Sequence, residues 1–337
     1  MRSLLVSSLS LLLACGDDGG GGDGGTDPAR WQLLASARPS SLLAAWASST
    51  TDVWVVGGRE AIGEGPVVLR YDGAAWSRLD TGIVNLDLWQ VFGFEGGPVF
   101  LAGSNGTILR YENGAFEKLT TPGTDIVFGL WGSSPTDVWA VGGQSGGRPF
   151  VWRYQGTSFE VVGGLPASLA GAVWKVTGRA ADDVWMSCSS GLVLHWDGAT
   201  LTSEQVGATG ESLFSLGCQG ERCVTAGAST SNGVLYESTG AGWTSRVPTT
   251  DGPAWRGVTP TGDHRFVVGA FGAVLRDDAG TWVPDPHGLT TQTLHAAWAT
   301  PTGELFAVGG QFDRALTLDG VMLYKGAVEL PVIPTDL

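Results

Sequence analysis

The sequence predicts an all-β fold, a seven-bladed β-propeller of four-stranded antiparallel blades that is closed by an N-terminal strand. Glycine occurs 53 times and tryptophan 15 times in 337 residues, which is typical of aromatic-rich strands joined by tight turns. A bulky residue, followed three positions later by glycine in six copies and cysteine in one, recurs seven times with a mean spacing of 42 residues. This period is long enough for one four-stranded blade.

Each repeat divides into four strands. The first is an apolar run such as residues 42–47, and the second carries the repeated bulky residue, as in residues 52–57. The third is the most regular, as in residues 68–73, and the fourth begins with an apolar residue just after the next turn. Short strands separated by Gly, Asp and Asn turns favour β-hairpins. The bulky residues are Trp54, Phe100, Trp139, Trp185, Val224, Phe266 and Phe306. The residues three positions later are Gly57, Gly103, Gly142, Cys188, Gly227, Gly269 and Gly309. The fourth strands are expected to begin at Trp76, Phe116, Phe159, Leu201, Trp243, Trp282 and Val328.

The chain enters the repeats out of phase. Residues 29–36 align with the fourth-strand segment 74–81, so that Trp31 matches Trp76. The last repeat ends with residues 327–333, a weak fourth strand that contains Pro331, a residue tolerated only at sheet edges and bulges. We therefore expect residues 31–35 to pair with the seventh blade and to cover an edge that would otherwise be exposed.

The N-terminal segment has the pattern of an export signal. Met1 and Arg2 precede an apolar run, residues 4–14, which is too short to span a bilayer and suits the core of a signal peptide. The run ends in Leu-Leu-Ala-Cys15, which resembles the lipobox of bacterial lipoproteins. This resemblance implies cleavage of residues 1–14 and a lipid on Cys15. An ordinary secretory signal with an incidental cysteine is the alternative.

A tether is expected between the lipid and the propeller. Residues 15–30 are rich in Gly and Asp, have little apolar surface to bury and should remain extended and mobile. Calcium binding by Asp17, Asp18 and Asp23 is a weaker alternative, because nothing fixes them in the geometry of a calcium loop. Residue 16 is Gly rather than Asp, which by resemblance to lipoprotein sorting rules favours the outer membrane, facing the periplasm or the cell surface. The propeller itself is assigned to residues 31–337.

Most tryptophans are expected to be structural. They recur once per repeat in two strand positions, which wedge packing between twisted sheets explains better than a sugar-stacking surface. The second-strand tryptophans are Trp54, Trp139 and Trp185, and the first-strand tryptophans are Trp46, Trp131 and Trp298.

A recurring cation on the third strand has two interpretations. The position is occupied by Arg70, Arg110, Arg153, His195 and Arg276. A ring of arginines could bind an acidic sugar. Pairing with a carboxylate of the same blade, such as Asp52 or Asp137, is the favoured interpretation.

Cysteines and catalytic motifs add little chemistry. Cys218 and Cys223 flank a turn between antiparallel strands, where a disulfide is geometrically accessible, and Cys188 is expected to be a buried free thiol. Residues 143–147 match the G-x-S-x-G pattern, but they lie between two strands with no helix to follow, so a hairpin loop is expected. The four histidines, His195, His264, His287 and His295, lack the spacing of a metal site, so no metal or cofactor is expected.

The chain resembles known propeller families in two stretches. In residues 53–76, the pair Gly57-Gly58 with Tyr71 and Trp76 resembles a kelch repeat. The phrase SSPTDVWAVG, residues 133–142, is similar to propeller lipoproteins grouped with bacterial BNR-like or photosystem-assembly-like propellers. The resemblance implies the fold only, because the glycine pair is present in three repeats and the sialidase Asp-box is absent. No sialidase or galactose-oxidase activity is carried over.

Function is expected in the variable loops between second and third strands. These loops share one face of a propeller with the connections between blades, and variable loops on a rigid scaffold commonly carry binding. The candidate binding residues are Arg59, Glu60, Arg148, Phe271, Phe312 and Arg314. A net charge of −14 argues against nucleic acid as a partner.

These observations predict a monomeric, lipid-anchored, non-enzymatic binding or scaffold module for protein or glycan. The alternative is a propeller hydrolase or lyase acting on polysaccharide. Such an enzyme needs at least two carboxylates converging on the channel mouth, and Glu60, Glu64 and Asp313 are the loop carboxylates available there.

Overall fold

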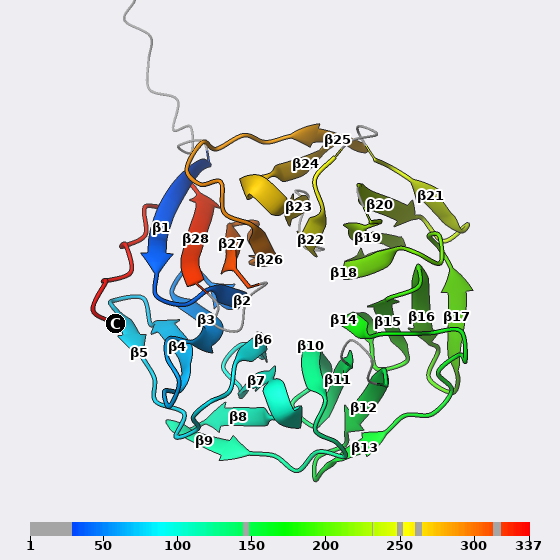
Figure 1. Cartoon of the computed structure of the whole chain (residues 1–337), viewed down its shortest axis with the longest axis horizontal. Coiled ribbons are helices and arrows are strands. Elements are labelled where there is room, and N and C mark those ends of the chain that lie inside the picture. Colours follow the sequence, from blue (N-terminus) through cyan, green and yellow to red (C-terminus); the bar gives the residue numbers. More distant parts are fainter. Residues whose placement is uncertain (1–28, 144–147, 231, 248–251, 260–264, 313–317) are drawn as a thin grey trace, which may run out of the picture.

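Seven four-stranded antiparallel sheets surround a central axis in the computed structural model (Figure 1). The structure describes residues 29–143, 148–230, 232–247, 252–259, 265–312 and 318–337. Within these ranges the helices are two short 3-10 turns, Ser104–Gly106 and Ala270–Gly272, and no helix there is long and apolar enough to cross a membrane. The predicted all-β, seven-bladed fold is confirmed.

The strands follow the predicted order, with the first strand of each repeat nearest the axis (Figure 1). Blade one contains β2 (Leu42–Ser49), β3 (Asp52–Arg59), β4 (Pro66–Tyr71) and β5 (Trp76–Arg78). Blade two contains β6 (Leu88–Gly93), β7 (Val99–Gly103), β8 (Ile108–Glu112) and β9 (Ala115–Lys118). Blade three contains β10 (Ile126–Ser134), β11 (Asp137–Gly143), β12 (Phe150–Tyr154) and β13 (Phe159–Val161). Blade four contains β14 (Val173–Ala180), β15 (Asp183–Cys188), β16 (Leu192–Trp196) and β17 (Leu201–Gln205). Blade five contains β18 (Ser212–Gln219), β19 (Arg222–Ala228), β20 (Gly233–Ser238) and β21 (Trp243–Ser245). Blade six contains β22 (Trp255–Val258), β23 (Phe266–Gly269), β24 (Val274–Asp278) and β25 (Thr281–Pro284). Blade seven contains β26 (Leu294–Ala299), β27 (Leu305–Gln311), β28 (Leu318–Gly326) and β1 (Arg30–Arg38).

The N-terminal strand closes the ring as predicted. β1 pairs antiparallel with β28, with Trp31 opposite Lys325 and Leu33 opposite Leu323. The sheet order is β1-β28-β27-β26, so the two ends of the propeller share one blade (Figure 1). Closure therefore depends on backbone hydrogen bonds and side-chain packing rather than on a covalent connection.

The expected fourth strand at Val328 is wrong, because β1 already occupies the free edge of β28. Residues 327–333 form no strand and instead lie against blades seven and one. The Ile333 amide donates to the Leu34 carbonyl at 2.8 Å, and the Trp76 indole donates to the Pro331 carbonyl at 2.9 Å. Pro331 has no amide hydrogen to give to a sheet ladder, but its carbonyl is free to accept this bond.

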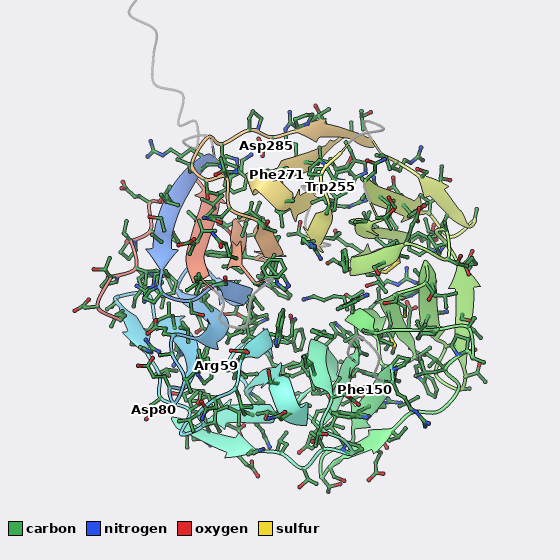
Figure 2. All side chains as sticks on the ribbon, viewed as in Figure 1. Arg59, Asp80, Phe150, Trp255, Phe271 and Asp285 are labelled. Carbon is green, nitrogen blue, oxygen red and sulfur yellow. A yellow bond between two sulfur atoms is a disulfide. The ribbon has the colours of Figure 1, made fainter. Side chains whose placement is uncertain are left out.

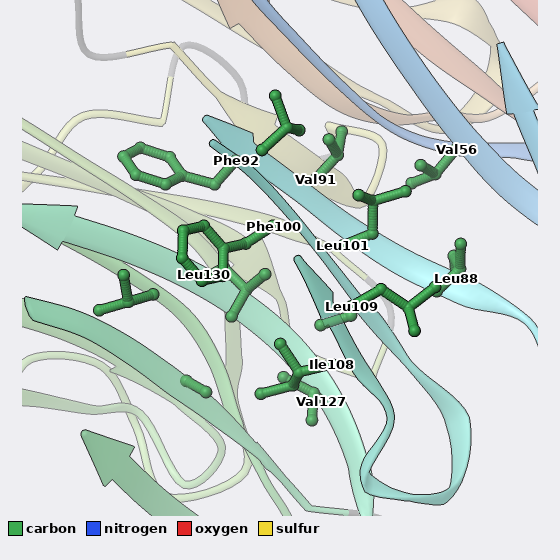
Figure 3. Close-up of a cluster of buried hydrophobic side chains, with 14 of the residues drawn as sticks. Val56, Leu88, Val91, Phe92, Phe100, Leu101, Ile108, Leu109, Val127 and Leu130 are labelled. Carbon is green, nitrogen blue, oxygen red and sulfur yellow. The ribbon is translucent and has the colours of Figure 1, made fainter. Parts of the chain in front are cut away.

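Tryptophans pack between neighbouring blades, as their register predicted. Trp54 and Trp139 are almost fully buried. A Cβ atom added to Gly93 of blade two would lie 2.8 Å from the Trp46 ring of blade one, which shows how closely that indole meets the next sheet. Figure 3 shows the apolar side chains that fill the interfaces of the first three blades, including Val56, Phe100 and Leu130. These interfaces hold the blades rigidly around the axis.

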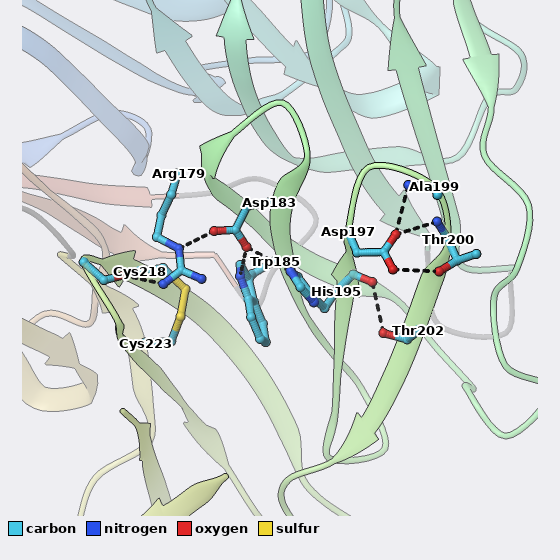
Figure 4. Close-up of polar contacts among 11 residues, drawn as sticks. Arg179, Asp183, Trp185, His195, Asp197, Ala199, Thr200, Thr202, Cys218 and Cys223 are labelled. Atoms are coloured by element: carbon cyan, nitrogen blue, oxygen red, sulfur yellow. Dashed lines mark hydrogen bonds and ion pairs between the residues drawn. A yellow bond between two sulfur atoms is a disulfide. The ribbon is translucent and has the colours of Figure 1, made fainter. Parts of the chain in front are cut away.

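The recurring third-strand cation pairs within its own blade. In blade one, Trp54 Nε1 and Arg70 Nε both donate to Asp52 Oδ1, at 3.1 and 3.3 Å. In blade four, His195 stacks on Trp185 at 3.9 Å, and both side chains bond Asp183 (Figure 4). These contacts confirm the interpretation that the cation at this position pairs with a carboxylate of its own blade. The remaining in-blade ion pairs are Arg153–Asp137, Arg110–Glu112 and Arg276–Asp278.

The three cysteines of the propeller take the predicted roles. Cys218 and Cys223 lie directly opposite each other on β18 and β19 and are joined by a disulfide (Figure 4). Cys188 is a buried free thiol, and burial raises its pKa far above the ordinary range. It is therefore neutral and a poor nucleophile.

Candidate functional site

Every innermost strand carries a β-bulge near its N-terminal end. In β6, Leu88 pairs with Gly103 and Gln90 pairs with Ala102, so Trp89 between them has no partner on β7. The same shift occurs once in each of the seven blades, and it turns one side chain per blade out of the regular ladder. The bulged residues are Leu43, Trp89, Phe128, Trp174, Phe214, Arg256 and His295.

The repeated glycine lies next to this bulge. A Cβ atom added to Gly103 would lie 2.0 Å from the Asp87 carbonyl oxygen, and one added to Gly227 would lie 1.8 Å from that of Ser212. Both carbonyls belong to the residue two positions before the bulged residue. Glycine is therefore favoured at these two positions because the backbone of the bulged strand approaches too closely for a side chain, whereas blade four has Cys188 at the equivalent position.

Six of the seven bulged side chains, all except that of Leu43, form a closed ring with Phe312 at one end of the channel. Phe312, which follows β27, fills the gap between blades six and seven. Centroid distances are 5.5 Å for Trp89–Phe128, 4.9 Å for Phe128–Trp174, 5.4 Å for Trp174–Phe214, 4.7 Å for His295–Phe312 and 5.7 Å for Trp89–His295. The Arg256 guanidinium carbon lies 4.2 Å from the Phe214 centroid and 5.6 Å from the Phe312 centroid. Blade one contributes the Leu43 carbonyl, which accepts a hydrogen bond from His295 Nδ1 at 2.7 Å.

We call the cavity inside this ring the channel mouth. It has a volume of about 310 Å³, and its described lining is aromatic and cationic, with no acidic residue. The lining residues are Trp89, Ile126, Phe128, Trp174, Lys175, Phe214, Arg256, His295 and Phe312. This volume lies at the lower end of the range for small-ligand pockets.

A hydrogen bond across the channel forms the floor of the mouth. Lys175 Nζ of β14 donates to Gln90 Oε1 of β6 at 2.6 Å. Further along the innermost strands, the cavity that Lys175 and Gln90 also line has a volume of only about 40 Å³. The mouth is therefore a cup that is closed below, and it does not admit a chain that would thread the ring.

Two positive charges lie in the mouth at neutral pH. Burial lowers the pKa of Lys175 to about 8, so the ammonium form still predominates at pH 7. Burial also lowers the pKa of Arg256, a guanidinium that stays protonated in proteins. His295 is neutral, because burial, together with the positive charges of Lys175 and Arg256, outweighs the Leu43 hydrogen bond and lowers its pKa to about 3.

Two further cavities extend the mouth outward across blades six and seven. A cavity of about 340 Å³ shares Arg256 and Phe312 with the mouth and is lined mainly by polar residues such as Gln292 and Gln311. A third cavity of about 410 Å³ shares Phe271 with the second. Its wall is mostly apolar and includes Trp255, which Figure 2 shows with Phe271 on blade six. We call these three cavities together the binding track.

Phe271 is held at the centre of this track in an unfavourable conformation. Its side chain is 78% exposed, and its φ of +60° is in the left-handed region that bulky residues rarely adopt. The matching 3-10 turn of blade two has Asn105 at this position, with φ of +55°. Asparagine tolerates this backbone, whereas phenylalanine adds strain and exposes apolar surface.

Two of the binding residues predicted from the sequence line the binding track, and two others form ion pairs. Phe271 and Phe312 line the binding track. Arg59 pairs with Asp87 of the next blade at 2.9 Å, and Glu60 pairs with Arg78 at 2.9 Å. A role in binding stays a prediction for these four residues.

Other candidates lie away from the track or outside the described ranges. Arg148 is exposed and lines none of the three cavities, and Glu64 is also exposed away from the mouth. Arg314, Asp313 and Cys15 lie outside the described residues. The two acidic loop residues of the enzyme alternative that can be placed, Glu60 and Glu64, do not line the mouth.

Sequence reasoning missed the residues that build the mouth. Trp89, Trp174, Lys175 and Arg256 were not candidates, and His295 was examined only as a possible metal ligand. The position of the repeated glycine was a signal that could have found them. Each bulged residue follows directly after the first-strand residue that pairs with this glycine or, in blade four, with Cys188. Alignment of the first strands on these pairs would have placed all seven positions together.

The fold is similar to several solved propellers. YCF48 from Cyanidioschyzon merolae matches with a TM-score of 0.64 and 17% identity over 88% of this chain and 98% of that chain. A structure described as YCF48 bound to D1 peptide matches with a TM-score of 0.62 and 15% identity over 88% and 98% of the chains. The WD40 β-propeller domain of Doa1 matches with a TM-score of 0.65 and 11% identity over 88% and 97%. No protein-family model matches the sequence, and no curated protein matches it significantly.

At these identities the likeness concerns the fold alone. The resemblance to photosystem-assembly-like propellers is confirmed at that level, while the kelch and BNR repeat types stay predictions. The chain is thus a seven-bladed β-propeller similar in fold to YCF48 and to WD40 propellers.

Proposed function

We propose that this protein is a non-enzymatic binding module that receives a segment of a partner protein in the binding track, held at the cell envelope by a lipid on Cys15. The observation that carries the proposal is the ring of bulged side chains, which converges from six blades on one cavity. Bulges commonly redirect side chains at functional sites. One similar propeller is described as bound to a D1 peptide, which supports a peptide as the kind of ligand.

The shape and chemistry of the track suit an extended peptide better than a polysaccharide chain. It joins an aromatic cationic mouth, a polar middle part and an outer apolar groove across two blades. Alternating polar and apolar contacts along an extended path are typical of peptide recognition. A glycan hydrolase would need paired carboxylates in the mouth, and none lines its described wall.

A parallel screen of peptides and glycans would test this proposal. Soluble protein starting at residue 29 would be offered a display library of peptides and an array of glycans. We expect peptides to be selected, and their affinity to fall at least tenfold in Phe312→Ala, since truncation of a central aromatic hot spot costs about 2 kcal/mol or more, and about 1.4 kcal/mol corresponds to tenfold.

The matched control is Val161→Ala, which truncates an exposed apolar side chain on β13, away from the track. It should bind the selected peptides as the parent protein does. Defined binding of glycans without peptides, or peptides that bind Phe312→Ala equally well, would contradict the proposal.

A further inference from the structure

The channel mouth holds positive charge that the described protein does not neutralise. Lys175 and Arg256 line it, no carboxylate of the described residues does, and the chain as a whole carries a large negative charge. Lys175 has one described acceptor, Gln90, for its three donor hydrogens. The Arg256 guanidinium lies over the faces of Phe214 and Phe312, and its Nε is buried without a hydrogen-bond partner among the described residues.

A third donor in the same wall is also unsatisfied. Trp89 Nε1 is buried and has no hydrogen-bond partner among the described residues. Buried donors without acceptors are costly, and the cost is larger for charged groups. A ligand that carries a negative charge and several acceptor atoms would therefore satisfy donors that have no acceptor among the described residues.

The closed floor determines which part of a peptide can enter. The Lys175–Gln90 hydrogen bond and the narrow space beyond it stop a chain from passing through. The aromatic walls offer few acceptors for backbone amides, so an internal loop of peptide would bury unsatisfied amide groups there. A chain end enters with one side chain and one charged group, which these walls and the two cations can accommodate.

We propose that the channel mouth binds the chain-terminal carboxylate of the docked segment, with Lys175 and Arg256 as its cationic partners. This inference rests on the proposed function and assigns the direction of the peptide. The last side chain is apolar and contacts Trp174 and the neighbouring rings. The preceding residues cross the polar part of the track and reach the apolar groove at Phe271.

Charge-assisted hydrogen bonds give this arrangement its selectivity. A guanidinium and an ammonium bind a carboxylate more strongly than a neutral amide, and the aromatic surroundings reduce solvent screening. An uncharged chain end would leave both cations buried without an anion from the ligand or from the described lining of the mouth. The site therefore distinguishes a free carboxylate from the same peptide ending in an amide.

Synthetic probes test the proposal directly. The first pair is N-acetylphenylalanine and its neutral C-terminal amide, followed by a selected peptide as free acid and as amide. Binding would be measured by the tryptophan fluorescence of the protein and by calorimetry. We expect the acid of each pair to bind at least tenfold more tightly than the amide.

Variants connect the effect to the mouth. Lys175→Met and Arg256→Met should each weaken binding of the acids and remove most of the difference between acid and amide. The matched controls are Lys118→Met on β9, which is exposed, and Arg276→Met on β24, whose side chain pairs with Asp278. Both controls should retain the preference for the acid. Circular dichroism and unfolding curves would show that each variant is folded.

The pH dependence gives a second measurement. Since the pKa of Lys175 is about 8, affinity for the acids should fall as the pH rises from 7 to 9, and Lys175→Met should reduce this fall. His295 remains neutral and Arg256 remains charged in this range, so neither produces the change.

The outcomes separate this inference from the proposed function. Acid and amide peptides that bind equally, or acids that fail to bind, would overturn the carboxylate assignment, while peptide binding that depends on Phe312 would still support the binding module. A peptide amide whose affinity is restored by an aspartate at its last position would assign the mouth to an acidic side chain and would also overturn the proposal. Failure of all peptides would contradict both.

Discussion

Lys175→Met should change how the stability of the propeller depends on pH. The buried ammonium has a pKa of about 8, against an ordinary value of 10.5. Below pH 8 both the folded and the unfolded chain hold the proton, so the folded state carries the full cost of burying the charge. Between pH 8 and 10.5 the unfolded chain binds more protons, so the free energy of unfolding rises with pH. The pKa difference sets an upper limit of about 3 kcal/mol on this rise in the free energy of unfolding.

The substitution also removes the hydrogen bond to Gln90, whose side chain is buried. An unsatisfied buried amide oxygen costs about 1–3 kcal/mol, which offsets part of the gain from removing the charge. At pH 7 Lys175→Met should therefore equal or exceed the parent protein in stability, by up to about 2 kcal/mol. Near pH 10.5 the order should reverse, because the parent protein no longer carries the buried charge.

Urea unfolding at both pH values, followed by tryptophan fluorescence, measures this reversal. The difference between parent and variant should move by about 3 kcal/mol in favour of the parent from pH 7 to 10.5. Other alkaline titrations, such as those of tyrosine, occur in both proteins and cancel in the difference. Lys118→Met should show no such movement, and a difference between parent and Lys175→Met that stays constant with pH would refute the reasoning.

Three further predictions concern the anchor, the closure and the strained turn. Cys15→Ser should move the protein from the detergent-extracted membrane fraction to the soluble fraction, and unchanged partitioning would exclude a lipid on Cys15. Deletion of residues 29–36 should lower the free energy of unfolding by several kcal/mol in a denaturant titration, because it removes Trp31 and most of the β1 ladder, and an unchanged midpoint would contradict closure through β1. Phe271→Asn should raise stability by about 0.5–1 kcal/mol by relieving the left-handed strain, yet weaken binding of the selected peptides. Stronger or equal peptide binding by this variant would show that Phe271 does not contribute to peptide binding.

The fold was predictable because its signals are local and repeated. The spacing of the glycines gave the blade, and the match of Trp31 to Trp76 gave the closing strand. The error at Val328 arose where two segments competed for one sheet edge. Local apolar pattern cannot decide such a competition, because pairing between the two ends of the chain is a property of the closed ring.

The site was less accessible for a different physical reason. Lys175 and Arg256 belong to separate repeats, and each is an ordinary cation within its own strand. Their shared cavity exists only because the bulges of six blades turn side chains toward one axis. The spacing of the repeated glycines was visible in the sequence, but its cause, a carbonyl oxygen approaching within about 2 Å of where a Cβ would stand, is visible only in three dimensions.

The bulged positions also have a consequence for how this surface can change. Those of blades two to seven line the mouth, and the backbone that presents them is fixed by a neighbouring glycine or by Cys188 rather than by the bulged side chain. Substitution at such a position alters the channel wall without rearranging the packing between blades. Single amino-acid changes in the ring can therefore give one scaffold a different ligand preference, and changes at two neighbouring ring positions should be coupled because their side chains contact each other.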